Sequence, residues 1–158
     1  DSKRLTHRQR EDLYVKIRAV AVAVATGQAE AEEIDRINIY QAGLKAMVKA
    51  VRALPVRPQH LLVDARTLGH LHLPQQALIH GDSLSASIAA ASVVAKVTRD
   101  RQMKVLDGLY PGYGFGRHMG YGTCQHRQAL AHLGASPVHR KSFTIKEMGC
   151  TEGASPGT

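Results

Sequence analysis

The chain has 158 residues and a mass of 17.2 kDa, which fits one domain large enough to bury a core. Hydrophobic residues make up 44% of it, a globular composition that excludes a disordered chain. No run of about 18 apolar residues occurs, so we expect no membrane span. The net charge of +8 and the pI of about 9.8 favour a polyanionic partner, most simply nucleic acid.

The first elements are predicted from caps and composition. Thr6 and Gln9 match a capping box, which predicts a helix that runs to about Arg18. Residues 19–29 alternate Ala and Val and are predicted as a strand. A short acidic helix start follows at residues 32–35.

Asn38 is predicted to cap a longer helix over residues 39–54, which two prolines end. Short apolar strands are then predicted at residues 60–64 and 76–80, with a loop between them. This alternation of helices and short strands predicts an α/β domain.

The second half is predicted to be mainly helical. Residues 83–109 form the longest predicted helix, and its first half is rich in alanine. A glycine-rich aromatic loop follows at 109–116, and Thr123 is predicted to cap a last helix that ends near Leu133. The residues after Gly149 are predicted to be a disordered tail.

Two cysteines, Cys124 and Cys150, lie far apart without Cys-x-x-Cys spacing. We therefore expect two reduced thiols rather than a zinc site or a disulfide framework. No signal peptide is visible, and with reduced thiols this predicts a cytoplasmic protein.

Two aspartates are candidate metal ligands. Asp64 ends the first predicted strand, and Asp82 follows the second in the sequence His80-Gly81-Asp82. Hard divalent ions such as Mg²⁺ prefer carboxylate oxygens, and two such ions can stabilise the attacking and leaving oxygens in hydrolysis of a phosphodiester. The alternatives are that Asp82 caps the following helix and that Asp64 is a turn residue.

Three further segments carry candidate substrate contacts. Ser2 and Lys3 place a hydroxyl and a cation before the first helix, as a phosphate grip or as an exposed end. Lys96 lies on the long predicted helix, either as a phosphate contact or on a solvated charged face. Tyr121 lies in a segment that mixes aromatic, glycine and basic residues, where its ring can stack on a sugar or base and its hydroxyl can contact a 2′-OH.

Six blocks stand out over about residues 1–146: DSKRLT at 1–6, EEIDRINIYQA at 32–42, LLVDA at 61–65, GDSLSASIAAASVVAKVTRDR at 81–101, YPGYGFGRHMGYGT at 110–123 and HRKSF at 139–143. In sequence and in order, these blocks resemble bacterial ribonuclease HII, the type 2 ribonuclease H.

The resemblance implies a ribonuclease H-like α/β fold with a C-terminal helical extension. It implies an endoribonuclease that cleaves the RNA strand of RNA–DNA hybrids and nicks DNA duplexes 5′ to a single embedded ribonucleotide. It also implies two-metal hydrolysis with Mg²⁺ or Mn²⁺ and a monomeric protein. By motif, Asp64 and Asp82 match two metal-binding carboxylates, Tyr121 matches the tyrosine that reads the ribonucleotide, and Ser2 and Lys3 match a segment near the substrate backbone.

The chain departs from the family in one respect. An adjacent Asp-Glu pair and a Gly-Arg-Gly segment, which the family carries before the Asp-Ser-Lys segment, are absent from this sequence. We therefore expect residues 1–146 to be a ribonuclease HII domain that lacks its N-terminal strands, followed by a disordered tail at 147–158. The isolated chain is expected to be inactive or nearly so. The alternatives are a basic fragment that binds nucleic acid without cutting it, and a remnant that does not fold.

Overall fold

The computed structural model describes residues 2–143, which form seven helices and two strands. In chain order these are α1 (His7–Val20), α2 (Ala31–Ile37), α3 (Ile39–Arg52), β1 (Leu61–Asp64), β2 (Gln75–Leu78), α4 (Gly81–Leu84), α5 (Ala86–Leu109), α6 (Phe115–His118) and α7 (Cys124–Leu133).

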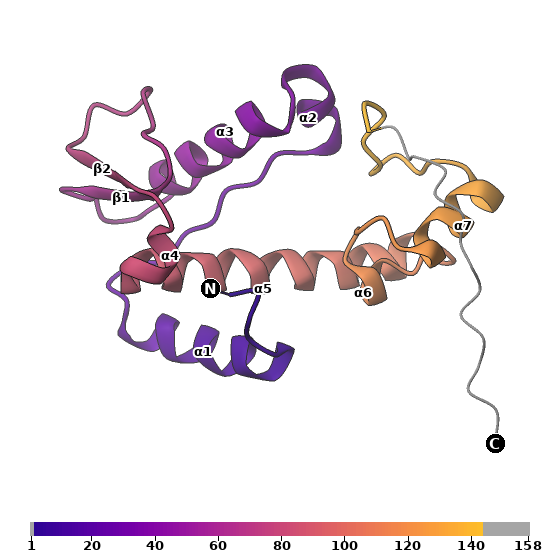
Figure 1. The fold of residues 1–158 in the computed structure, drawn as a ribbon, viewed down its shortest axis with the longest axis horizontal. Coiled ribbons are helices and arrows are strands. Elements are labelled where there is room, and N and C mark those ends of the chain that lie inside the picture. Colours follow the sequence, from indigo (N-terminus) through magenta and orange to yellow (C-terminus); the bar gives the residue numbers. More distant parts are fainter. Residues whose placement is uncertain (1, 144–158) are drawn as a thin grey trace.

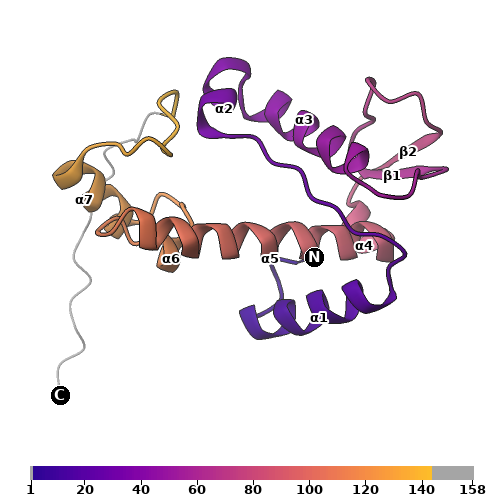
Figure 2. The same ribbon diagram turned by 180° about the vertical axis from the view of Figure 1, so that it is seen from behind.

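Helix α5 is the axis of the molecule, and the other elements lie around it (Figure 1). Helix α1 lies along one side, and α2 and α3 lie on the other. The two strands and α4 are at one end of α5, and α6 and α7 are at the opposite end, as the view from behind also shows (Figure 2). The buried face of α5 includes Val93, Val97 and Asp100, at the spacing of four and three residues that places side chains on one helical face.

Two hydrophobic clusters lie at opposite ends of α5. One packs α3 against β1 and the loop after it, around the buried side chains of Val48, Leu61 and Val63. The other surrounds Met103, near the C-terminal end of α5, together with Tyr113 and Phe115. Helix α5 therefore links the strand end of the molecule to its C-terminal helical end.

The strands β1 and β2 are parallel, and Asp64 at the end of β1 pairs with Leu78 at the end of β2. Both strands were predicted within two residues of these bounds. Because parallel strands run in the same direction, their carboxyl ends lie at the same edge of the sheet. The segments that follow the two strands therefore begin side by side.

Local capping predictions are confirmed at three helices. Thr6 forms a complete capping box with Gln9, and the side chains of Asn38 and Thr123 accept backbone N–H groups at the starts of α3 and α7. The side chain of Ser85 does the same for α5, by accepting the N–H of Ile88.

That cap corrects the prediction of one unbroken helix over residues 83–109. Ser85 has extended backbone angles (φ −127°, ψ 123°), so α4 ends before it and α5 starts after it. Serine side chains compete for nearby backbone N–H groups, which favours a helix start over a helix interior.

The predicted strand at residues 19–29 is also wrong. Helix α1 continues to Val20, and residues 21–30 lack regular secondary structure. They pass between α3 and α5 in both views (Figures 1 and 2). Within the described residues this segment pairs with no strand, and Val22, which is 90% exposed, has no pleated surface to pack on.

The C-terminal end adds two differences from the sequence predictions. The predicted glycine-rich loop leads into the short helix α6. Cys124 is disulfide-bonded, so the expectation of a reduced thiol is wrong there, whereas Cys150 and the predicted tail lie outside the described residues. Between residues 2 and 143, no helix is both long and apolar enough to cross a membrane.

Candidate metal and nucleic-acid site

The edge of the sheet brings the two candidate carboxylates into one neighbourhood. Oδ1 of Asp64 accepts the backbone N–H of Gly81 at 2.9 Å, and Gly81 is the residue before Asp82. This bond ties the end of β1 to the first turn of α4. The alternative that Asp82 caps a helix is wrong, because His80 is the N-cap of α4 and Asp82 lies within its first turn.

The backbone is strained beside both aspartates. Ala65, after Asp64, has φ 60°, and His80, two residues before Asp82, has φ 55°. Residues with side chains rarely adopt this left-handed region. The N–H of Arg66 also donates to the carbonyl of Asp64 at 2.8 Å, which closes a three-residue turn around Ala65. Such strain gathers at functional sites, where surrounding contacts maintain it.

Gly81 allows this close approach. A Cβ atom at this position would lie 2.6 Å from Cδ1 of Ile88 and 3.3 Å from Oδ1 of Asp64. A side chain here would push against both α5 and the carboxylate. Glycine therefore keeps the Asp64 oxygen within hydrogen-bonding distance of the α4 backbone.

The carboxylates of Asp64 and Asp82 suit a hard divalent cation, but they supply only part of the ligands that such a cation needs. One oxygen of Asp64 is engaged by Gly81, while a carboxylate has further lone pairs for a cation. Across residues 2–143, no group of three or more His, Cys, Asp or Glu side chains is arranged to hold a metal ion. Asp64 and Asp82 thus fit as two members of a larger ligand set.

The predicted substrate contacts Tyr121, between α6 and α7, and Lys96, near the middle of α5, lie together. The Tyr121 side chain is 61% exposed, and Nζ of Lys96 lies 5.5 Å from the centre of its ring. A cation at this distance is attracted by the electrons of the ring face. The arrangement presents an aromatic surface beside a positive charge.

Lys96 is held by a buried carboxylate that sequence reasoning missed. Its Nζ contacts Oδ1 of Asp100 at 2.6 Å, and Asp100 is only 3% exposed. Asp100 also lies 3.8 Å from Nη2 of Arg10, on α1. The spacing of Lys96 and Asp100, four residues apart on a helix, was the signal that could have identified this pair.

Arg10 connects the same network to the N-terminal segment. Its Nη1 donates to the carbonyl of Ser2 at 3.2 Å and to that of Leu5 at 2.5 Å. The Ser2 side chain is buried, and its hydroxyl lies 2.7 Å from that of Ser92 on α5. This position favours an anchoring role for Ser2, whereas the neighbouring Lys3 is exposed.

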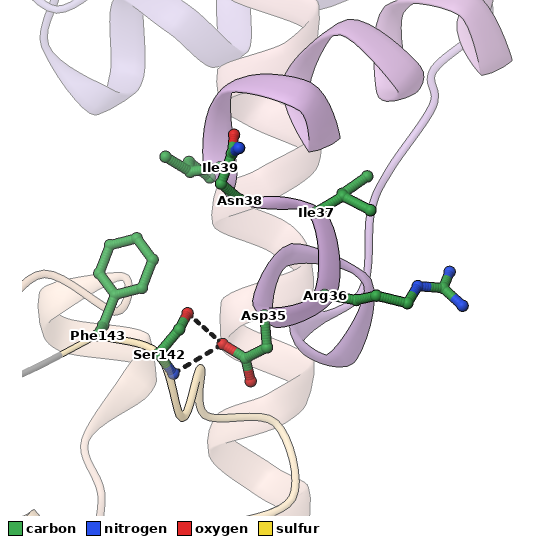
Figure 3. Close-up of a pocket in the computed structure, with 7 residues that line it drawn as sticks. All are labelled: Asp35, Arg36, Ile37, Asn38, Ile39, Ser142 and Phe143. Carbon is green, nitrogen blue, oxygen red and sulfur yellow. Dashed lines mark hydrogen bonds between the residues drawn. The ribbon is translucent and has the colours of Figure 1, made fainter.

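A pocket of about 450 Å³ lies at the other side of the fold, between α2 and the C-terminal segment (Figure 3). Asp35 accepts the N–H groups of Lys141 and Ser142 and the hydroxyl of Ser142, at 2.5–2.9 Å. The Ser142 hydroxyl and these backbone donors lower the pKa of Asp35 below its usual value. Two blocks that resemble the same family, residues 32–42 and 139–143, therefore meet here.

Comparisons with known proteins agree with this architecture. The family model described as Ribonuclease HII matches residues 1–146. The chain is 59% identical over 143 residues to a Ribonuclease HII from an Anaeromyxobacter species, which covers 90% of this chain and 45% of that protein. It is equally identical, at 59% over 143 residues, to a Ribonuclease HII from Geobacillus kaustophilus, with 90% and 55% covered.

A Ribonuclease HII from Myxococcus xanthus is 54% identical over 159 residues, with 99% of this chain and 54% of that protein covered. The chain spans about half the length of these curated relatives. Among solved structures, a ribonuclease H2 from Pyrococcus horikoshii matches with a TM-score of 0.74 and 24% identity, over 92% of this chain and 76% of that one. This structural match shows the fold alone.

Proposed function

The chain belongs to the ribonuclease HII family, and from this premise we propose that the protein is an endoribonuclease that cleaves the RNA strand of RNA–DNA hybrids. Its substrates would include DNA duplexes with a single embedded ribonucleotide, nicked on the 5′ side. The observation that carries the proposal is the hydrogen bond from Gly81 to Asp64, which ties the end of β1, with Asp64, to the first turn of α4, with Asp82.

Asp64 and Asp82 would hold the divalent cation, Mg²⁺ or Mn²⁺, since both ions suit oxygen ligands. A bound ion supplies stabilisation of the charge that develops on the oxygens of a phosphodiester during hydrolysis. Gly81 would orient Asp64 by donating its N–H to Oδ1, and the tight turn at Ala65 would keep the carboxylate at the sheet edge.

Tyr121 and Lys96 would recognise the substrate. The exposed Tyr121 ring would stack on a sugar or base, and its hydroxyl would contact the 2′-OH that distinguishes RNA from DNA. Lys96, beside the ring, and the exposed Lys3 would bind phosphates. Ser2 would support these contacts by anchoring the N-terminal segment to α5. The resemblance further supports a monomer that acts in the cytoplasm.

A second candidate function is binding of nucleic acid without cleavage. The described residues contain no group of three or more potential metal ligands, which favours this candidate for the chain as it stands. The net charge of +8 and the exposed Tyr121 support binding under either candidate.

The test measures binding and cleavage in parallel on one labelled DNA duplex that carries a single ribonucleotide, with an all-DNA duplex as control. The chain is compared with Asp82→Asn, with Tyr121→Ala and with a matched control, Asp12→Asn, on the exposed side of α1. Reactions contain Mg²⁺ or Mn²⁺.

We expect preferential binding of the ribonucleotide duplex, lost in Tyr121→Ala and kept in Asp12→Asn. Cleavage 5′ to the ribonucleotide that disappears in Asp82→Asn establishes the enzyme. Selective binding without cleavage instead favours the second candidate. Equal affinity for both duplexes, with no cleavage, contradicts both.

A further inference from the structure

Three histidines near Tyr121 pack against Phe115 of the second hydrophobic cluster. His118 belongs to α6, His126 to α7 and His139 to the segment after α7. The rings of His118 and His126 stack with their centres 4.3 Å apart, and Nε2 of His126 lies 3.0 Å from Nε2 of His139. The ring of Phe115 packs against all three.

The hydrogen-bond partners determine where the protons of this cluster reside. The N–H of Ser136 points to Nδ1 of His139 at 2.9 Å, so that nitrogen is an acceptor and the proton of His139 resides on Nε2. Nε2 of His139 therefore donates to Nε2 of His126. His126 then carries its proton on Nδ1 and donates it to the carbonyl oxygen of Tyr121 at 3.0 Å.

The hydrogen bonds from His139 to His126 and from His126 to Tyr121 form a relay that ends at the backbone of Tyr121. Other hydrogen bonds also hold this backbone. The N–H of Tyr121 donates to the carbonyl of His118 at 2.9 Å, and the N–H of Thr123 donates to the carbonyl of Tyr121 at 2.8 Å. His118 also holds the residue before Tyr121, because its Nδ1 accepts the N–H of Gly120 at 3.2 Å. The backbone of Tyr121 is thus fixed, while its ring stays exposed.

We propose that His126 and His139 are positioning residues: by a hydrogen-bond relay to the carbonyl of Tyr121 they hold the exposed ring in the orientation that recognises a ribonucleotide. This inference rests on the proposed role of Tyr121 in substrate recognition. It adds a supporting pair that does not itself contact the substrate.

The relay requires neutral imidazoles. A second proton on His126 would face the N–H of His139, and a second proton on His139 would face the N–H of Ser136. Among the described residues, the titratable rings that pack on the pair are His118, against His126, and Tyr113, against His139, and neither offers a carboxylate. Burial lowers the pKa of both histidines below the ordinary value, and the charge of the neighbouring imidazoles lowers each pKa further.

The sign of the pH dependence follows from these lowered values. A histidine whose pKa is lower in the folded than in the unfolded chain stabilises the fold fully above its unfolded pKa, about 6.5. That contribution is lost as the pH falls through the lowered value. The orientation of Tyr121 is therefore expected to persist at neutral pH and to loosen in acid.

The experiment compares two substitutions at His126. In His126→Asn the side-chain amide replaces Nδ1 and still donates to Tyr121, whereas His126→Phe keeps the ring and loses the donor. His132→Phe, exposed on the same helix, is the matched control. Fluorescence anisotropy measures the ratio of affinities for the ribonucleotide duplex and the all-DNA duplex, from about pH 8 to about pH 5.

We expect His126→Phe to lose about fivefold in this ratio at neutral pH, the effect of one hydrogen bond. In the unmodified chain we expect the ratio to decline in acid. His126→Asn keeps most of the ratio at neutral pH and removes this decline, whereas His132→Phe changes neither the ratio nor its decline. An unchanged ratio in His126→Phe, or equal losses in His126→Phe and His126→Asn, would overturn the inference.

Amide hydrogen exchange at Tyr121 and Thr123 gives a readout that does not depend on the substrate. Equal affinity of the unmodified chain for both duplexes, with no cleavage, would refute the proposed function, and exchange would still test the hydrogen-bond relay. Faster exchange in His126→Phe than in His126→Asn supports the relay. Exchange that is the same in both variants and in the unmodified chain overturns it.

Discussion

At the residue scale, Asp100 organises the cations beside the proposed recognition surface. Its carboxylate is 3% exposed and contacts Lys96 on its own helix and Arg10 on α1. A buried carboxylate is costly unless it is paired, and here two cations provide the pairing. Lys96 is in turn held against the ring of Tyr121. One buried side chain therefore couples the packing of α1 to the surface that carries the proposed substrate contacts.

Replacement of this carboxylate tests its role. Asp100→Asn removes the negative charge between two partly buried cations, so we expect the free energy of unfolding to fall by about 3 kcal/mol. Urea denaturation monitored by circular dichroism measures the change, with the exposed Asp12→Asn as control. Equal stability of the two variants would mean that the cations find other partners at no cost.

At the element scale, residues 21–30 depend on close contact with α3. A Cβ atom at Gly27 would lie 2.1 Å from the carbonyl oxygen of Ala46 and 2.7 Å from the amide nitrogen of Ala50. Lys49 also donates from Nζ to the carbonyl of Gln28 at 3.0 Å. Gln102 on α5 also donates from its side-chain amide to that of Gln28. The segment is thus held by backbone contact and side-chain donors, whereas a strand would use a ladder of backbone hydrogen bonds.

Two glycine substitutions separate this contact from helix propensity. Gly27→Ala forces the segment away from the α3 backbone, and we expect it to cost about 2 kcal/mol of stability. Gly43→Ala, within α3 and with open space around its Cβ position, is expected to add up to about 1 kcal/mol. Thermal melts of both variants measure the difference, and a stabilised Gly27→Ala would contradict the close packing.

At the scale of the whole molecule, α5 links two parts of the proposed site. Its start follows the α4 turn that carries Asp82, and Lys96 lies about 15 Å further along the axis at 1.5 Å per residue. Helix α5 thus connects the α4 turn that carries Asp82 to Lys96, whose ammonium group lies beside the ring of Tyr121. The net charge of +8 over the whole sequence favours a polyanion.

Salt dependence tests this electrostatic role. We expect the affinity for the ribonucleotide duplex to fall linearly with the logarithm of salt concentration, because bound phosphates release counterions. Lys3→Ala is expected to reduce the slope by about 1 if Lys3 binds a phosphate. Lys16→Ala, exposed on α1, is the control and should leave the slope unchanged. Equal slopes for all three proteins would remove Lys3 from the interface.

By itself, the sequence determined the features that depend on neighbouring residues. The caps at Thr6, Asn38 and Thr123, the two short strands and the positions of Asp64 and Asp82 after them were all predictable, because capping and strand patterns act over a few residues. The family resemblance was predictable too, since its blocks are contiguous motifs.

Contacts between residues far apart in the sequence became visible only in the folded chain. The tertiary structure joined Asp64 to Gly81, placed Lys96 between Asp100 and Tyr121, and stacked His118 on His126. It also kept residues 21–30 out of a sheet, because a strand needs a partner for its backbone groups and its composition alone cannot supply one. Burial and hydrogen-bond partners are properties of the packed chain, and for that reason the supporting residues of the site were not visible before its elements were brought together.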